Sequence, residues 1–143
     1  MMETEPYLIE RYIVTGDVKL VYRHLLQLGE LTERAAVASE CAAEQDRFWE
    51  FRTALYYSQQ ELYGSGSLDI ILADIAVDNQ MDRGPFVNCL ESDRYVEAVR
   101  SDFEASRRER VQSRPVFDIN GQRVVGAQAI DVFVQTIEEE LAK

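Results

Sequence analysis

Apolar residues recur at helical spacing along most of the chain and alternate only near its C-terminal end. In residues 5–13 the apolar side chains share one helical face, and Thr15-Gly16 follows, a pair that commonly stops a helix. Residues 18–22 read Val-Lys-Leu-Val-Tyr, a short run that favours a strand. The pattern therefore predicts that the chain opens with a helix followed by a strand.

Between residue 31 and about residue 111 the apolar spacing stays helical, which predicts a block of consecutive helices. Thr32 is a candidate N-cap for an alanine-rich helix that runs through Ala43. Gly64-Ser65-Gly66 and Gly84-Pro85 interrupt the spacing and predict breaks between helices. The remaining helical segments that we expect are residues 46–60, a helix from residue 67 onward, residues 86–90, and a longer helix that ends at 107–110.

The spacing changes in the last third of the chain. Residues 115–119 alternate as a strand does, and Asn120-Gly121 is the strongest hairpin signal in the sequence. Residues 122–125 then predict the return strand, and residues 131–141 a closing helix with one apolar face. The predicted order is helix and strand, a block of helices, and a β-hairpin followed by a helix.

Charge narrows the range of partners. The 143 residues carry 15 basic and 26 acidic side chains, a net charge of −11. This balance argues against nucleic acid and anionic membrane surfaces, which bind to a positive field. The sequence has no apolar run of about 18 residues and no basic and apolar leader at its start, so we expect no membrane partner and no signal peptide.

Few residues are candidates for catalysis or ligand binding. His24 is the only histidine, and an ordinary hydrogen bond at the end of the predicted strand is a simpler role for it than catalysis. His24 and the two distant cysteines have no metal-binding spacing, so we expect no metal and no cofactor. The arginines at 107, 108 and 110 suit the C-terminal end of a helix. The aromatic residues at 48, 49, 51, 56 and 57 are expected in the core.

Three separated blocks, residues 12–24, 40–50 and 115–128, resemble the DsbA-like thiol-disulfide oxidoreductases in the same order. The resemblance implies an α/β, thioredoxin-like fold with an α-helical insertion, in which the first, central strand is missing from this chain. It implies a single domain with its core at residues 1–28 and 112–143 and the insertion at 29–111. The chain as written has no leader, which favours a cytoplasmic location, whereas many members of that family are extracytoplasmic.

The resemblance also implies a substrate-binding loop. In the thioredoxin fold, the proline that opens the third strand is cis and presents backbone to an extended peptide. Pro115 matches that position, and Arg114 precedes it where the family usually has threonine or valine. We therefore expect Arg114 and Pro115 to contact an extended peptide or a protein thiol substrate.

The catalytic motif of the family is absent from this sequence. DsbA-like enzymes carry Cys-x-x-Cys at the start of a helix, where the helix dipole favours a thiolate. This chain has only Cys41 and Cys89, so no catalytic residue is assigned and we expect no dithiol activity. Relatives often have cysteines at both places. Three alternatives remain open for Cys41 and Cys89 of this chain: a structural disulfide, two separate buried thiols, or a redox pair.

Three functions are consistent with these features. The first is a shortened DsbA-like oxidoreductase whose strand and dithiol are encoded upstream of Met1. The second is a redox-inactive module that binds peptides or proteins. The third is an interaction protein that works through its helical insertion. The missing strand would lie between residues 18–22 and 116–119. Its absence would leave backbone groups unpaired on both of these strands. A strand from a second chain would satisfy those groups, so we expect a homodimer.

Overall fold

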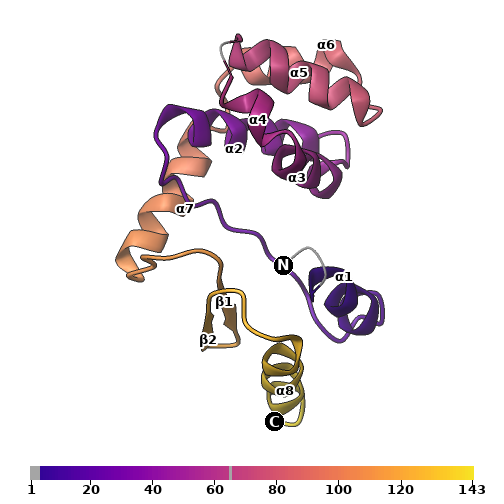
Figure 1. Cartoon of the computed structure of the whole chain (residues 1–143), viewed down its shortest axis with the longest axis vertical. Coiled ribbons are helices and arrows are strands. Elements are labelled where there is room, and N and C mark those ends of the chain that lie inside the picture. Colours follow the sequence, from indigo (N-terminus) through magenta and orange to yellow (C-terminus); the bar gives the residue numbers. More distant parts are fainter. Residues whose placement is uncertain (1–3, 65) are drawn as a thin grey trace. The chain divides into compact units, whose positions relative to one another are not determined.

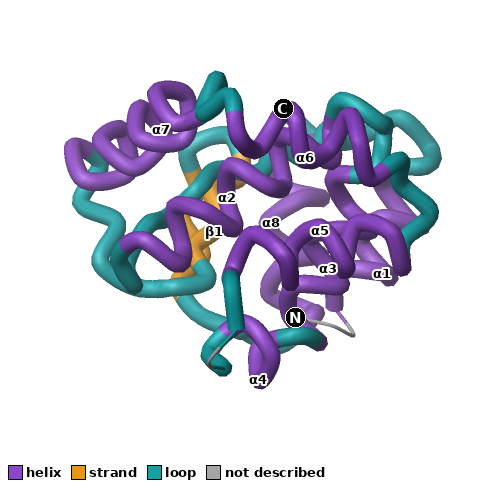
Figure 2. Tube along the Cα trace, turned by 90° about the horizontal axis from the view of Figure 1, so that it is seen from above, coloured by secondary structure: helices purple, strands orange, loops and turns teal. Residues whose placement is uncertain are grey.

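The computed structural model describes residues 4–64 and 66–143, most of which are helical (Figures 1 and 2). The chain forms two compact units. The first, which we call the terminal unit, combines Met1–Tyr22 with Arg107–Lys143, and the second, the helical unit, is Arg23–Ser106. The boundaries expected at residues 28/29 and 111/112 stay a prediction. None of the described helices is long and apolar enough to cross a membrane.

The terminal unit begins with two short helices, α1 (Thr4–Leu8) and the π-helix η1 (Ile9–Ile13). Gly16 follows with a φ of 87°, so the predicted stop is confirmed. Tyr12 is buried, and its hydroxyl donates to Glu138 Oε1 at 2.8 Å. Arg11 donates to the same oxygen at 3.0 Å. Because Tyr12 and Arg11 both donate to this carboxylate, the pKa of Glu138 is lowered, and η1 is fastened to the C-terminal helix α8 (Ile130–Leu141).

A β-hairpin packs against α8 in the same unit. Strands β1 (Val116–Ile119) and β2 (Gln122–Val125) pair antiparallel, as the sequence predicts. Asn120 and Gly121 have φ values of 50° and 94°, the left-handed conformations that a two-residue type I′ turn requires. Phe117 on β1 meets Phe133 on α8 edge to face, with ring centroids 4.9 Å apart. This contact holds the hairpin on the helix.

The predicted strand at residues 18–22 is wrong. These residues have no regular secondary structure, and the described part of the chain contains one sheet, made of β1 and β2 alone. An extended segment becomes a strand only when a neighbouring strand accepts and donates its ladder hydrogen bonds. Residues 18–22 have the right side chains for a strand but no such neighbour among the described residues.

The helical unit confirms the predicted block of helices. Its elements are α2 (Glu30–Ala43), α3 (Phe48–Tyr57), α4 (Gln59–Leu62), α5 (Leu68–Asp78), α6 (Arg83–Glu91) and most of α7 (Val96–Arg108). Within the predicted break at Gly64-Ser65-Gly66, Ser65 lies outside the described residues.

Two local predictions in this unit are wrong in position. Helix α2 starts at Glu30, with Gly29 as its N-cap residue, so Thr32 lies in the first turn. The Thr32 hydroxyl instead donates to the Gly29 carbonyl at 2.8 Å and accepts the Leu28 N–H at 3.2 Å. The break predicted at Gly84-Pro85 lies a few residues earlier, between the end of α5 at Asp78 and the start of α6 at Arg83, and Gly84-Pro85 itself lies in the first turn of α6. Proline is tolerated there because the first N–H groups of a helix have no partner within the helix.

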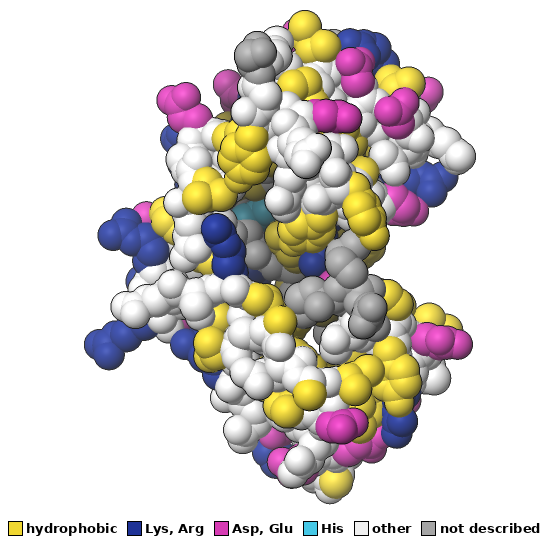
Figure 3. All heavy atoms as spheres, viewed as in Figure 1, with side chains coloured by type: hydrophobic (Ala, Val, Ile, Leu, Met, Phe, Trp, Pro, Cys, Tyr) yellow, Lys and Arg dark blue, Asp and Glu magenta, His cyan; other side chains and the backbone are white. Residues whose placement is uncertain are grey.

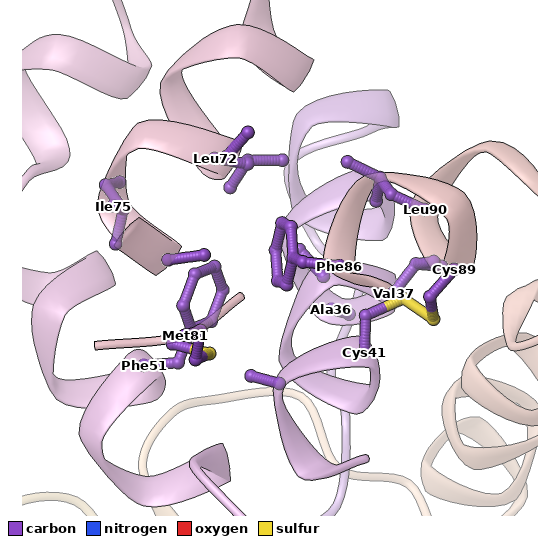
Figure 4. Packing of buried hydrophobic residues seen from close by; sticks show 14 of the residues in the cluster. Ala36, Val37, Cys41, Phe51, Leu72, Ile75, Met81, Phe86, Cys89 and Leu90 are labelled. Carbon is purple, nitrogen blue, oxygen red and sulfur yellow. A yellow bond between two sulfur atoms is a disulfide. The ribbon is translucent and has the colours of Figure 1, made fainter. Parts of the chain in front are cut away.

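The core of the helical unit is built on α2. This helix buries a run of small residues, and α3, α5 and α6 all pack against it. Large side chains from those three helices fill the space over it, with Phe51 of α3 and Phe86 of α6 in ring contact at 5.3 Å (Figure 4). The small residues that α2 buries are Ala36, Val37, Ala38, Ser39, Cys41 and Ala42.

Ion pairs fasten the outside of the same helices. Arg34 on α2 donates two hydrogen bonds to the carboxylate of Asp69 on α5, at 2.7 and 2.8 Å. Arg100 on α7 makes the same two-point contact with Glu33 on α2, at 2.7 Å for both bonds. The guanidinium groups lower the pKa of Asp69 and the pKa of Glu33, because a carboxylate that accepts charged hydrogen bonds holds its proton less tightly.

These shifts predict acid sensitivity. A carboxyl group whose pKa is lower in the folded state stabilises the fold above its ordinary pKa, and that contribution is lost as the pH falls through the folded value. Stability should therefore hold from pH 7 to about 4.5 and fall below that, measured by denaturant unfolding at each pH. Asp69→Asn should flatten the fall, whereas Glu91→Gln, at an exposed position at the end of α6, should leave it unchanged. Stability that rises between pH 4.5 and pH 3 would contradict the prediction.

Candidate functional site

The first candidate site is the loop that enters the hairpin. The Arg114–Pro115 peptide bond is cis, Pro115 is half-buried and the side chain of Arg114 is exposed. The Pro115 carbonyl accepts the Gly126 N–H at 2.8 Å, which extends the contact between the two strands by one residue. Proline has no backbone N–H, and it fits this position because the strand ladder needs no hydrogen-bond donor there. The loop is thus held by the hairpin on its C-terminal side, and the Arg114 side chain lies on the surface.

Helix α7 ends just before this loop. Its last residues, Arg107 and Arg108, lie in the last turn, where the helix dipole favours cations, as the sequence predicts. Arg123 on β2 donates to the Glu109 carbonyl at 2.9 Å and so connects the hairpin to the segment after α7. The segment of chain that precedes Pro115 is therefore rich in arginine, although the chain as a whole is acidic.

The second candidate site is the cysteine pair. Cys41 on α2 and Cys89 on α6 are joined by a disulfide, with their Cα atoms 5.7 Å apart and a separation of 48 positions in sequence. The two residues are 1% and 0% exposed. Figure 4 shows the bond between them among the buried hydrophobic residues of the cluster. The bridge connects two helices of the helical unit in the middle of its core.

The surroundings of the two sulfur atoms differ from those of a reactive thiol. A redox-active cysteine is accessible and placed where positive charge favours the thiolate, as at a helix N-terminus. Cys41 is two residues from the last residue of α2, and Cys89 is two residues from the last residue of α6. The negative ends of both helix dipoles therefore lie near the sulfur atoms and disfavour a thiolate. Burial further prevents attack by an incoming thiol.

His24 lies in the irregular segment before α2, not at the end of a strand. It is buried, and its Nε2 is 2.7 Å from Glu40 Oε1, while its backbone N–H donates to Asp102 Oδ2 at 3.3 Å. Phe48 contacts the ring edge to face. These contacts tie the segment to α2 and α7 within the helical unit, the structural hydrogen bonding that the sequence favoured over catalysis.

The residues that the structure describes contain no group of three or more side chains that could hold a metal ion. They do contain an aromatic surface that the sequence interpretation missed. Of the aromatic residues expected in the core, Phe51 is fully buried, but Trp49 is 40% and Tyr57 is 76% exposed. The only signal in the sequence was the number of aromatic residues on α3, which is more than one buried face can take.

Comparison with known proteins fits this geometry. A thioredoxin family model matches residues 2–139, and the chain belongs to this family. The crystal structure of oxidised BdbD from Bacillus subtilis matches with a TM-score of 0.83 at 23% identity, over 96% of this chain and 76% of that one. The fold is therefore thioredoxin-like, mostly helical with a small two-stranded sheet, and the resemblance to the DsbA-like group is confirmed.

Three curated proteins are similar in sequence. The chain is 28% identical over 142 residues to the probable disulfide bond formation protein D of Bacillus anthracis, covering 96% of this chain and 64% of that protein. It is 24% identical to disulfide bond formation protein D of Bacillus subtilis (strain 168), covering 95% and 63%. It is 29% identical to the Na(+)/H(+) antiporter NhaA 3 of Salinispora tropica, covering 98% of this chain and 21% of the antiporter. The chain thus spans just under two thirds of the two disulfide bond formation proteins.

The bridge predicts a large stability effect. Closing the loop between Cys41 and Cys89 restricts the unfolded chain, which in the chain-entropy model is worth about 4 kcal/mol. Cys41→Ala with Cys89→Ala should lower the free energy of unfolding by about 2–5 kcal/mol, measured by urea denaturation without reductant. Adding reductant should destabilise the wild type and not the variant. Equal stability of wild type and variant would contradict a bridge.

Proposed function

We propose that this chain is a DsbA-like protein of the thioredoxin family that docks an extended polypeptide at the Arg114–Pro115 loop, and that its 143 residues do not catalyse dithiol exchange. One observation carries the second half of this proposal. The sequence has two cysteines, and both are buried and bonded to each other inside the helical unit. No thiol is left for the exchange reaction.

Disulfide exchange requires an accessible thiolate. The thiolate attacks one sulfur of a disulfide, the other sulfur leaves as a thiolate, and a neighbouring thiol then resolves the mixed disulfide. Cys41 and Cys89 meet neither requirement, because no thiol of a partner can reach them and neither has a second cysteine beside it in the sequence. We therefore assign the pair a structural role.

The docking half of the proposal is supported by family membership and by the loop. Two of the three curated relatives are named disulfide bond formation proteins, which points to protein thiols as the class of partner. Arg114 is exposed beside the cis peptide bond, so its guanidinium group can reach a backbone carbonyl or a carboxylate of a docked segment. The hairpin behind the loop is fixed by its turn and by the Phe117–Phe133 contact, which keeps the docking position constant.

A homodimer is part of the same proposal. The hairpin is the one sheet in the described residues, so each of its two strands has one edge without a ladder partner there. Such edges readily pair with a strand from another chain. Sedimentation equilibrium tests this point, and a mass equal to that of one chain, 16.4 kDa, at micromolar concentration would contradict it.

The catalytic test uses the 143-residue chain itself. In insulin reduction and in the oxidation of a dithiol peptide, its rate should equal that of the buffer blank, because it offers no reactive thiol. A thioredoxin run in parallel shows that the assay works, and the Cys41→Ala, Cys89→Ala variant is the matched control. Turnover that the variant loses would make the pair redox-active, and turnover that the variant keeps would show another route. Either result would contradict the proposal.

A further inference from the structure

Helix α3 carries aromatic side chains on two faces, and only one face is used by the core. Phe51 points into the cluster with Phe86, whereas Trp49 and Tyr57 remain on the surface. Residues 49, 53 and 57 are spaced by four, so Trp49, Thr53 and Tyr57 form one stripe along the helix. This stripe takes no part in the proposed docking at Pro115.

The stripe forms one wall of a groove inside the helical unit. The groove has a volume of about 640 Å³, and its other wall is the C-terminal end of α5, with Ile75, Asp78 and Asn79. This volume lies within the range of known ligand-binding clefts. Because the groove is open rather than enclosed, it suits side chains of a partner polypeptide better than a small molecule that must be surrounded.

The lining combines aromatic rings with carboxylates. Glu50 and Asp78 lie in the groove beside Trp49 and Tyr57. Glu50 pairs with Arg47 at 3.0 Å. Asp78 is exposed, and among the described residues no cation forms an ion pair with it. Aromatic rings next to a carboxylate that no described cation pairs with are groups that attract a cation.

The same chemistry already occurs on α3. The guanidinium group of Arg52 lies over the ring of Trp49 at 5.6 Å and over the ring of Tyr56 at 5.1 Å. These distances are typical of cation–π contacts. The aromatic surface of this helix therefore already contacts one cation of its own chain.

The charge of the whole helical unit agrees with a cationic partner. Residues 23–106 contain seven arginines and no lysine against sixteen acidic residues, which gives this unit −9 of the net charge of −11. Acidic side chains are spread over the visible surface of the molecule (Figure 3). Such a field attracts basic segments and repels anionic ones. A purely apolar segment would remove Asp78 from water without giving it a partner, which costs free energy.

We propose that the groove between α3 and α5 binds a basic segment of a partner polypeptide, with an arginine or lysine side chain lying against Trp49 and Tyr57 and its charge facing Asp78. The contact is distinct from the loop at Arg114 and Pro115 and does not depend on it. It would give the protein a second recognition surface, selective for positively charged partners.

Trp49 is the only tryptophan in the chain, so its fluorescence reports on this groove directly. The probe is an acetylated, amidated nonapeptide of alternating serine and arginine, titrated into the intact chain at low salt. The comparison peptide has glutamine in place of arginine. We expect a saturable change in Trp49 emission with the arginine peptide and none with the glutamine peptide. No change with either, or an equal change with both, would overturn the proposal.

Substitutions locate the contact. Asp78→Asn should weaken binding about fivefold, the effect of losing one exposed charge pair of about 1 kcal/mol. Tyr57→Leu should weaken it about two- to fivefold, while Tyr57→Phe, which keeps the ring, should retain it. Glu91→Gln removes the same charge from the same unit but lies outside the groove, so its affinity should match the wild type. A loss with Glu91→Gln equal to that with Asp78→Asn would overturn the site in favour of a diffuse attraction.

Discussion

The close packing of three helices on the small residues of α2 is the constraint on which the helical unit depends. Ala38 and Ala42 are fully buried, and with no bulk beyond Cβ they let α3, α5 and α6 approach the helix. Phe51, Leu72 and Phe86 then fill the space over it, and Cys41 comes near enough to Cys89 for a bond. A larger residue at either alanine would push these helices apart and strain the bridge at the same time.

This packing decides what the cysteines can do. Because both sulfur atoms lie in the centre of the core, no partner thiol can reach them without local unfolding. Of the aromatic residues of α3, only Phe51 is fully buried in the same core, while Trp49 and Tyr57 are exposed and line one wall of the groove. The disulfide-bonded core and the aromatic groove therefore both belong to one arrangement of helices.

Local signals in the sequence predicted the elements that depend on local physics. Asn120-Gly121 predicted the hairpin because a type I′ turn needs two left-handed residues, and apolar spacing predicted the block of helices. The strand at residues 18–22 failed because pairing depends on a neighbour that no local pattern reveals. Gly84-Pro85 predicts the break between α5 and α6 a few residues too late, because a proline in the first turn of a helix and one between two helices look alike in sequence.

The same distinction between local signals and long-range contacts applies to the candidate sites. The resemblance pointed to Pro115 and to the cysteines, but residue spacing left three states open for Cys41 and Cys89, because contact between residues 48 apart is a property of the folded chain. The most direct test of the structural role of this bridge is its reduction in the native protein. The protein is equilibrated in thiol buffers of known potential, and free thiols are alkylated and counted by mass spectrometry. The account predicts a bridge that stays closed down to about −300 mV and opens when the protein is denatured. Two alkylated thiols per native chain at about −200 mV, in the range of redox catalysts, would contradict it.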